Sequence, residues 1–363
     1  MTDVLYHAMS KTHNVFCLMA RKTSDRQEAG FVYLPNDKDL HSKENYLFVH
    51  DFIVEHQIDF VINQDGITPK DSEFIIRSAS GYAKVITVLH SELTRIYGVE
   101  THLPPKVVVY MPQCLLNVAN CISHYYFRHK YGRYWRLAVE QSHSICLLDD
   151  SMKASTIRFL RCFDYCSKFV AINNPITLCM PQAHIDVVNK KKQLLYVGRL
   201  SGEKNLEMLL KIWSMIERKH KEWSLQIVGD GPERKRLTEM ANDLQLRNVR
   251  FEGQKSPEAY YADASIFCMT SLYEGLPLVL LEAMSYSVVP IAFNSFSSLP
   301  SIIDNGINGY IIRPYDLKEY AETLSSLMSD IDMRSRMSFR AFDKVGSFSL
   351  NRILTAWDEL FTK

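Results

Sequence analysis

The sequence predicts an α/β protein with one doubly wound parallel sheet in each half of the chain. Short apolar runs alternate with longer amphipathic stretches along most of the 363 residues, as expected for strands covered on both faces by helices. The alternation breaks between Asn173 and Lys192, where Pro175 and Pro181 precede three consecutive lysines. The length also favours two domains. We therefore expect domains at residues 1–175 and 176–345, followed by a helix within residues 346–363 that packs back toward the first domain.

The apolar periodicity places the elements of each half. In the first half, strands are expected at Asn14–Ala20, Phe60–Asn63, Lys84–His90, Ser144–Leu148 and Lys168–Ile172. Helices between them are expected at Val4–Ser10, Leu40–Glu55, Ser72–Ser80, Leu115–Glu140 and Ser151–Cys166. In the second half, strands are expected at Leu194–Gly198, Ser224–Val228, Val249–Phe251, Ile266–Met269, Val288–Ala292 and Tyr310–Ile312. Helices there are expected at Lys204–Lys219, Glu233–Leu244, Pro257–Ala262, Pro277–Ser285, Asp316–Met328, Ile331–Val345 and Leu350–Phe361.

Charge and cysteine content exclude several classes of function. The net charge of +1 creates no field that would attract nucleic acid, so we expect no nucleic-acid partner. The eight cysteines lack the paired spacing of a zinc site. The first residues lack the apolar core of a signal peptide, and no long uncharged stretch follows. We expect a cytoplasmic protein, with peripheral contact with the inner face of the cell membrane as an open alternative.

Residues Thr270–Ser287 (TSLYEGLPLVLLEAMSYS) form the clearest candidate site. Glu274 lies in the loop before a predicted helix, and Glu282 lies in its second turn among apolar residues, where an unpaired carboxylate is costly. Pro277 fits the first helical position, and Gly275 allows a ligand to approach the backbone. The free N–H groups of the helix start favour an anion. The alternative is a capping carboxylate and an ordinary helical glutamate.

A second candidate follows the first strand of the second half. The segment Tyr196–Asn205 (YVGRLSGEKN) predicts a strand that ends at Gly198 and a helix that begins near Glu203. Arg199 and Lys204 would project from this corner, where a guanidinium and an ammonium can hold a diphosphate. The spacing is not that of a Walker loop. The alternative is a solvated corner with two surface cations.

Read in order, the motifs of the second half resemble family-4 retaining glycosyltransferases of GT-B fold, the glycosyl transferases group 1. The matching motifs are YVGRLSGEKN, VGDGP, VRFEGQ, the two glutamates of Ser271–Ala283, and NGINGYI. The resemblance implies two Rossmann-like domains that face each other across a cleft. It also implies metal-independent chemistry without a cofactor, in which a UDP- or GDP-sugar is the donor substrate.

The resemblance further implies roles for single residues. Arg199 and Lys204, after Gly198, would bind the donor diphosphate and stabilise the leaving group. Glu274 would contact the donor sugar and Glu282 the ribose. The remaining donor-binding residues implied are the backbone N–H groups of Gly275 and Leu276, and Gly253 and Gln254 beside the base.

The first half resembles the family's acceptor domain less specifically. His90, in VLHS, occupies a position where the family often has a functional histidine or acid, and we expect it in the active site. A histidine that caps a buried strand is the alternative, and Gln64 and Asp65 follow a neighbouring strand. Family members usually open with a strand, a Gly-rich loop and a helix. The first residues here resemble the inside of that helix, so we expect the first domain to lack that strand and loop.

The stretch Arg128–Arg136 (RHKYGRYWR) combines four fixed cations with aromatic residues. As a helix of the acceptor domain it could contact anionic lipid headgroups, which would suit a lipid-linked acceptor. The alternative is a solvated basic helix whose aromatic residues lie in the core.

The resemblance implies a hexosyltransferase. It also implies, as partners, a nucleotide-sugar donor and a saccharide or lipid-linked saccharide acceptor, in the assembly of a bacterial capsule, O-antigen or exopolysaccharide. Two alternatives are a catalytically silent binding partner of the same fold and a nucleotide-sugar epimerase.

Overall fold

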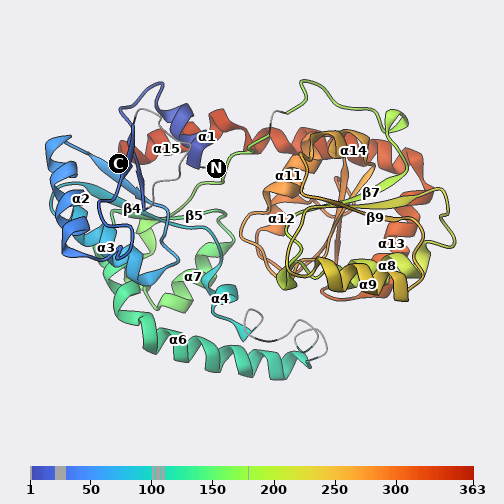
Figure 1. The fold of residues 1–363 in the computed structure, drawn as a ribbon, viewed down its shortest axis with the longest axis horizontal. Coiled ribbons are helices and arrows are strands. Elements are labelled where there is room, and N and C mark those ends of the chain that lie inside the picture. Colours follow the sequence, from blue (N-terminus) through green and yellow to red (C-terminus); the bar gives the residue numbers. More distant parts are fainter. Residues whose placement is uncertain (1, 21–29, 100–102, 104–106, 108–110, 179) are drawn as a thin grey trace. The chain divides into compact units, whose positions relative to one another are not determined.

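The computed structural model describes residues 2–20, 30–99, 103, 107, 111–178 and 180–363. The chain divides into two compact units, which are described separately (Figure 1). The first contains residues 1–98, 118–175 and 350–363, and the second contains residues 99–117 and 176–349.

The first unit contains a four-stranded parallel sheet in the order β3-β4-β5-β6. β4 (Lys84–Leu89) has the sequence KVITVL, and its last five residues are all buried, which explains its continuous apolar character. The other strands of this sheet are β3 (Phe60–Asn63), β5 (Ser144–Leu147) and β6 (Phe169–Ala171). A separate parallel pair, β1 (Cys17–Met19) and β2 (Phe31–Tyr33), adds a strand that the periodicity does not predict.

The first unit contains the helices α1 (Thr2–Met9), α2 (Lys43–Glu55), α3 (Pro69–Ala79), α4 (Leu93–Ile96), α7 (Met152–Leu160) and α15 (Leu350–Phe361). It also contains α6 (Gln113–Gln141) from residue 118 onward, while residues 113–117 of this helix belong to the second unit. The predicted helix Ser151–Cys166 is wrong beyond Leu160, because Arg161 adopts a left-handed conformation (φ 54°) that ends α7. The 3₁₀ segment η2 (Phe163–Lys168) follows. The C-terminal helix α15 packs on this unit, where the rings of Phe361 and Phe60 lie 5.0 Å apart.

The second unit contains a six-stranded parallel sheet in the order β12-β11-β10-β7-β8-β9. Its strands are β7 (Gln193–Val197), β8 (Ser224–Val228), β9 (Val249–Gly253), β10 (Ile266–Met269), β11 (Val289–Phe293) and β12 (Tyr310–Ile312). The first three strands extend the sheet in one direction from β7, and the last three extend it in the other. This is the order of a dinucleotide-binding Rossmann sheet, with the reversal between β7 and β10.

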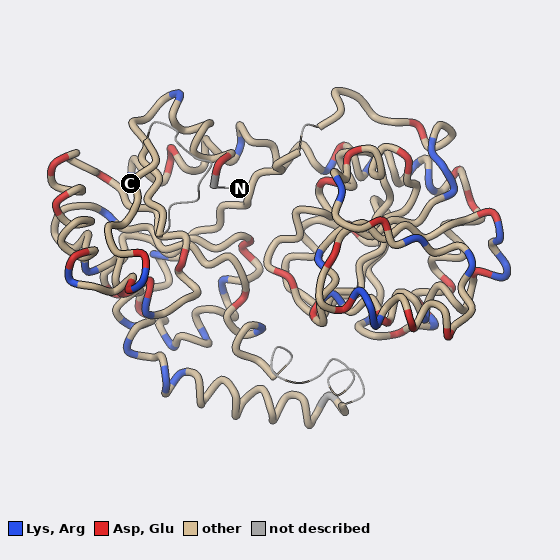
Figure 2. The backbone as a smooth tube through the Cα atoms, viewed as in Figure 1, with Lys and Arg blue, Asp and Glu red and all other residues tan. Residues whose placement is uncertain are grey.

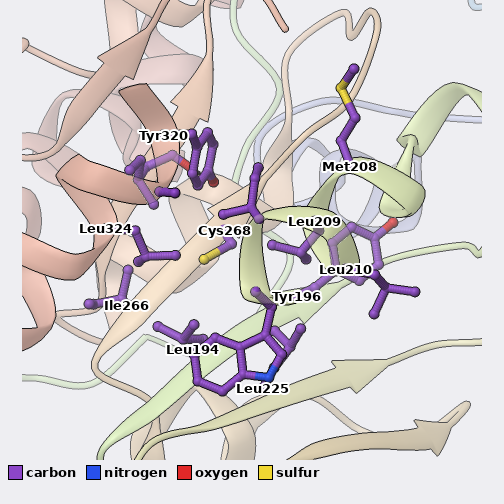
Figure 3. Packing of buried hydrophobic residues seen from close by; sticks show 14 of the residues in the cluster. Leu194, Tyr196, Met208, Leu209, Leu210, Leu225, Ile266, Cys268, Tyr320 and Leu324 are labelled. Carbon is purple, nitrogen blue, oxygen red and sulfur yellow. Dashed lines mark hydrogen bonds between the residues drawn. The ribbon is translucent and has the colours of Figure 1, made fainter. Parts of the chain in front are cut away.

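Helices cover both faces of this sheet, with α8, α9 and α13 on one face and α11 and α14 on the other (Figure 1). The helices are α8 (Leu206–Ile216), α9 (Arg234–Asp243), α10 (Glu258–Asp263), α11 (Leu278–Ser285), α12 (Leu299–Ile302), α13 (Leu317–Ser329) and α14 (Ile331–Val345). The 3₁₀ segments are η3 (Val187–Asn189), η4 (Gly202–Lys204) and η5 (Gly346–Phe348). The core between sheet and helices is close-packed around Trp213, which is fully buried. Figure 3 shows part of this cluster, including Leu194, Tyr196, Leu209 and Leu324.

Glycines allow the backbones at the ends of β7 and β8 to approach closely. Gly229 has a φ of 133°, and a Cβ atom there would lie 1.9 Å from the carbonyl oxygen of Gly198. A Cβ atom at Gly231 would lie 2.4 Å from the carbonyl oxygen of Leu200. The amide of Gly198 donates to the carbonyl of Val228 at 3.0 Å. These contacts fix the loop that carries Arg199.

We expect Gly229→Ala to destabilise the second unit by about 1–3 kcal/mol, because the added methyl group would force two backbone segments apart. Gly132→Ala, in the interior of α6, should instead stabilise the protein by about 0.5–1 kcal/mol, because nothing lies within 4 Å of the new methyl group. Thermal unfolding of both variants measures these shifts. Equal melting temperatures for Gly229→Ala and the parent would contradict the packing described.

Candidate functional site

The candidate site lies at the carboxyl ends of β7 and β10 in the second unit. These two strands are neighbours in the sheet, but their connections leave in opposite directions. In open α/β sheets this reversal leaves a crevice outside the strand ends, which is the usual place for a ligand. The loop after β7 carries Arg199 and Lys204, and the loop after β10 carries Glu274. The structure therefore brings the two sequence-predicted segments to one edge of the sheet.

Lys204 and Glu274 form an ion pair across these loops. The Nζ atom of Lys204 donates to both carboxylate oxygens of Glu274, at 2.7 and 3.0 Å. The two side chains are only 24% and 13% exposed, so they form a more protected pair than surface ions do. Sequence reasoning gave these residues separate roles but did not predict this direct contact.

Backbone contacts hold the Lys204 segment in place. Lys204 ends η4, and the amide of Leu272 donates to the carbonyl of Glu203 at 2.8 Å. The buried hydroxyl of Thr270 donates to the carbonyl of Lys204 at 3.2 Å and to that of Asn205 at 3.1 Å. The loop after β10 is thus bonded to the backbone of residues 203, 204 and 205, on both sides of Lys204.

Arg199 presents its side chain to solvent. The residue is exposed, and among the described residues the structure gives its guanidinium no hydrogen bond or ion pair. Its backbone is fixed, because the buried hydroxyl of Tyr196 donates to the Arg199 carbonyl at 3.0 Å. A guanidinium on a fixed backbone, in the same loop as Lys204, provides a second cation for an anionic ligand.

The start of α11 differs from the prediction by one position. Pro277 is the residue before the helix (φ −74°, ψ 94°) and not its first helical residue, since α11 begins at Leu278. The extended ψ at Pro277 places it outside the helical region. The hydroxyl of Ser298 donates to the carbonyl of Gly275, which ties the loop ahead of α11 to the start of α12.

Glu282 is buried in the second turn of α11, with 7% of its surface exposed. One carboxylate oxygen accepts from the hydroxyl of Tyr261 at 3.0 Å, and the other accepts from Thr177 at 3.2 Å. Burial raises the pKa of Glu282, and the two hydrogen bonds offset part of this rise. Each oxygen keeps a lone pair for a ligand hydroxyl. Its role toward a ribose stays a prediction.

Sequence reasoning missed Tyr261 and Thr177 as partners of Glu282. Tyr261 is fully buried on α10, and burial beside Glu282 raises the pKa of its phenol. The two partners lie 21 and 105 residues from Glu282 in the sequence. The one signal in the sequence was the general rule that a buried carboxylate needs hydrogen-bond partners, and this rule does not say which residues they are.

The end of β9 places Arg234 beside Gly253. A Cβ atom at Gly253, which has a φ of 74°, would lie 3.1 Å from a guanidinium nitrogen of Arg234. Arg234 pairs with Asp230 at 3.0 Å. An open hollow of about 580 Å³ lies here, lined by Gly231, Pro232, Arg234, Lys235, Thr238 and Glu239. The predicted roles of Gly253 and of the exposed Gln254 beside a base are not tested by this arrangement.

His90 belongs to the first unit, where it directly follows β4. Its Nε2 atom lies 2.7 Å from the Oε1 atom of Gln64, so two residues singled out in the sequence are in contact. Burial lowers the pKa of His90 and raises that of Asp65. The contact is compatible with both readings of His90, and its place in an active site stays a prediction.

The structure also bears on metal binding, on membrane-spanning helices and on the basic stretch 128–136. Among the described residues, no cluster of three or more His, Cys, Asp or Glu side chains could hold a metal ion. Over the same part of the chain, no helix is both long and apolar enough to cross a membrane. In the basic stretch 128–136, Tyr134 and Trp135 are buried at 9% and 5% exposure, so these aromatic residues lie in the core.

Comparison with known proteins gives one family-model match, and it lies in the second unit. Residues 182–344 match the family model "Glycosyl transferases group 1". The chain is similar to an uncharacterized glycosyltransferase of Haemophilus influenzae, with 29% identity over 53% of this chain and 54% of the relative. It is also similar to the amylovoran biosynthesis glycosyltransferase AmsD of Erwinia amylovora, with 32% identity over 47% of this chain and 48% of the relative. The alignments thus span about half of each relative.

Solved structures resemble a larger part of the chain. The apo form of the lipopolysaccharide outer core galactosyltransferase WaaB has a TM-score of 0.67 at 15% identity, over 99% of this chain and 92% of that one. HepE of Anabaena, in complex with UDP and glucose, has a TM-score of 0.65 at 15% identity, over 92% and 85%. These likenesses show that the fold is GT-B. The expected cleft between the domains stays a prediction.

The raised pKa of Glu282 predicts a pH-dependent effect of Glu282→Gln. The protonated carboxyl favours folding below the unfolded pKa of about 4.3, and this contribution is lost as the pH rises through the raised folded pKa. Because glutamine does not titrate, the variant should gain stability relative to the parent over that range. Melting temperatures between pH 4.5 and 8 measure the difference. A difference that stays constant with pH would contradict the assignment, and Glu322→Gln, whose side chain is 68% exposed, is the control.

Proposed function

We propose, from the match of residues 182–344 to the family model of the glycosyl transferases group 1, that the protein transfers a sugar from a nucleotide diphosphate sugar to an acceptor hydroxyl. The observation that carries the proposal is the Lys204–Glu274 pair at the reversal between β7 and β10. A diphosphate needs cations, and a sugar needs hydrogen-bond acceptors. The pair holds one of each at the strand ends where a ligand is expected.

Binding of the donor would rearrange this pair. The diphosphate competes with Glu274 for the Lys204 ammonium, and the nearby Arg199 guanidinium adds a second positive charge. Once released, the Glu274 carboxylate can accept hydrogen bonds from the donor sugar. The ion pair therefore prepares both groups, because it keeps each charge partly buried and in position for the ligand.

The chemical step follows from the same groups. The bond between the anomeric carbon and the phosphate oxygen breaks, and its electron pair remains on the diphosphate, where Lys204 and Arg199 stabilise the developing charge. The acceptor oxygen attacks the anomeric carbon from the face that the phosphate leaves, and its proton passes to the leaving phosphate oxygen. The product retains the anomeric configuration. The cations perform the task that a metal ion performs elsewhere.

The donor is proposed to be a UDP- or GDP-sugar, with Glu282 on the ribose hydroxyls, Gly198, Gly275 and Leu276 around the phosphates and Gly253 and Gln254 beside the base. The resemblance in fold to HepE, whose structure holds UDP and glucose, supports this class of donor. We propose that His90 contacts the reacting sugar or the acceptor.

The acceptor is proposed to be a saccharide or a lipid-linked saccharide in the assembly of a bacterial surface polysaccharide. Support comes from the names of similar proteins, which include an amylovoran biosynthesis glycosyltransferase and a lipopolysaccharide outer core galactosyltransferase. Activity in the cytoplasm, with peripheral contact with the membrane, completes the proposal.

Donor binding is tested by thermal unfolding with nucleoside diphosphates and nucleotide sugars. A ligand present at 100 times its dissociation constant should stabilise the fold by about 2.7 kcal/mol. The Arg199→Ala, Lys204→Ala double variant should lose this shift. The control is Arg313→Ala, Lys318→Ala, which removes two cations whose side chains are 75% and 80% exposed. Equal shifts in the parent and the site variant would contradict the proposed diphosphate site.

Release of the nucleoside diphosphate then separates the candidate activities. A transferase releases it in a reaction that depends on an added saccharide acceptor and on Lys204. An epimerase converts the nucleotide sugar without releasing the diphosphate. Donor binding without either reaction, across all the saccharide acceptors supplied, would favour a silent binding partner.

A further inference from the structure

One face of the long helix α6 exposes a row of large apolar side chains. Val118, Ile122 and Tyr125 are 57%, 66% and 68% exposed. Their spacing of four and three residues places them in one line along the helix. Tyr126, beside this row, is 56% exposed, and Leu115, one turn earlier, is 57% exposed. Apolar residues scattered singly on a surface are common, but a continuous row marks a contact surface.

The same line continues into a cationic segment. Counting on from Tyr125 in steps of four, four and three gives His129, Arg133 and Arg136, all of them exposed. Figure 2 shows the first half of α6 without fixed charge and the second half with Lys and Arg. Glu140, in the last turn, is the one acidic residue in the sequence of this helix.

The opposite side of α6 is used for packing. Leu116, Tyr134, Trp135, Ala138 and Val139 are all buried. The Trp135 ring lies 5.0 Å from that of Tyr97 and 5.2 Å from that of Phe159. The aromatic residues near the end of α6 therefore fix the helix to the first unit. The exposed row is separate from this core and needs another explanation.

We propose that this outer face of α6, defined by Val118, Ile122, Tyr125, Arg133 and Arg136, docks on a membrane surface with anionic headgroups. An interfacial helix inserts apolar side chains at the boundary between headgroups and acyl chains, and its Lys and Arg side chains attract anionic lipid. The outer face has both parts, one after the other along a single line.

Charge favours lipid over a second copy of the chain. A facing copy of α6 would bring the same cations and one glutamate, so it offers little to neutralise Arg133 and Arg136. An anionic bilayer neutralises both arginines and covers the apolar row at the same time. An interfacial helix of this kind lies in the plane of the membrane surface.

Aromatic contacts hold the cationic side chains along the helix. The guanidinium of Arg133 lies 4.4 Å from the centre of the Tyr134 ring, and the ammonium of Lys130 lies 5.1 Å from that of Tyr131. Such contacts leave the charged head available to phosphate groups while the stem covers apolar surface. The proposal thus differs from the sequence-based expectation. The inserting residues precede the basic stretch, and its buried aromatic residues do not take part.

Vesicle sedimentation tests the docking surface with the full chain. The parent should bind phosphatidylcholine vesicles containing phosphatidylglycerol more tightly than pure phosphatidylcholine vesicles. Arg133→Gln, Arg136→Gln should weaken this binding roughly 25-fold, about fivefold for each cation removed. Val118→Ser, Ile122→Ser, Tyr125→Ser should reduce binding to both kinds of vesicle. Circular dichroism verifies that each variant is folded.

Matched controls use exposed residues outside the outer face. Leu47→Ser, Val54→Ser, Phe163→Ser removes three apolar side chains that are 46%, 46% and 63% exposed in the first unit, and it should bind like the parent. Arg313→Gln, Lys318→Gln should also bind like the parent. No preference of the parent for anionic vesicles, or an equal loss in controls and α6 variants, would overturn the proposal. So would a lipid-independent dimer that the serine variant dissociates.

The vesicle assay requires no sugar transfer and no nucleotide. A chain that binds vesicles but no nucleotide sugar would retain this inference and lose the proposed function. A chain that binds nucleotide sugar through Arg199 and Lys204 but does not bind vesicles would retain the proposed function and lose this inference.

Discussion

The reversal of strand order between β7 and β10 is the constraint on which the candidate site depends. Because the chain leaves these neighbouring strands in opposite directions, no connection covers their carboxyl ends. Two loops that are distant in sequence can therefore meet there. The Lys204–Glu274 pair is the result, with its two residues 70 positions apart. A sheet whose strands followed chain order throughout would not bring these loops together.

Close backbone packing makes this meeting point rigid. The glycines at the ends of β7 and β8 let two loops approach to distances that no side chain would allow. Hydrogen bonds from Thr270 and Leu272 then fix η4, so that the ion pair forms between anchored segments. In the proposed reaction, rigid support matters because charges that stabilise a leaving group are effective only if they are already in place. The exposed Arg199 is the least constrained cation of the site.

Sequence periodicity predicted the strands of the second unit well, because buried parallel strands are short apolar runs bounded by loop-forming residues. The strand Tyr310–Ile312, for example, has the bounds expected. Local backbone conformation was harder to predict. The left-handed Arg161 ends a helix that looks continuous in sequence, and Pro277 lies just outside the helix it was expected to begin. These outcomes depend on tertiary packing more than on residue type.

The positions of the candidate residues in the fold could be predicted in part. The motifs placed Arg199, Lys204, Glu274 and Glu282 at strand ends or at the start of a helix, and the structure has them there. Their direct partners could not be identified in this way. Tyr261 and Thr177 reach Glu282 from segments with no motif of their own, and only the folded chain shows which hydroxyl satisfies the buried carboxylate. Likewise, periodicity marked α6 as a helix but did not show which side packs.

The central claim is that Lys204 exchanges Glu274 for the donor diphosphate. A double-mutant cycle on the dissociation constant of UDP, measured by calorimetry, tests it most directly. The account predicts that Glu274→Gln binds UDP more tightly than the parent, because the competing carboxylate is gone. This gain should disappear when Lys204 is already alanine. The account is contradicted if Glu274→Gln weakens UDP binding. It is also contradicted if Glu274→Gln changes UDP binding equally with lysine and with alanine at position 204, because the diphosphate then does not bind by breaking the Lys204–Glu274 ion pair.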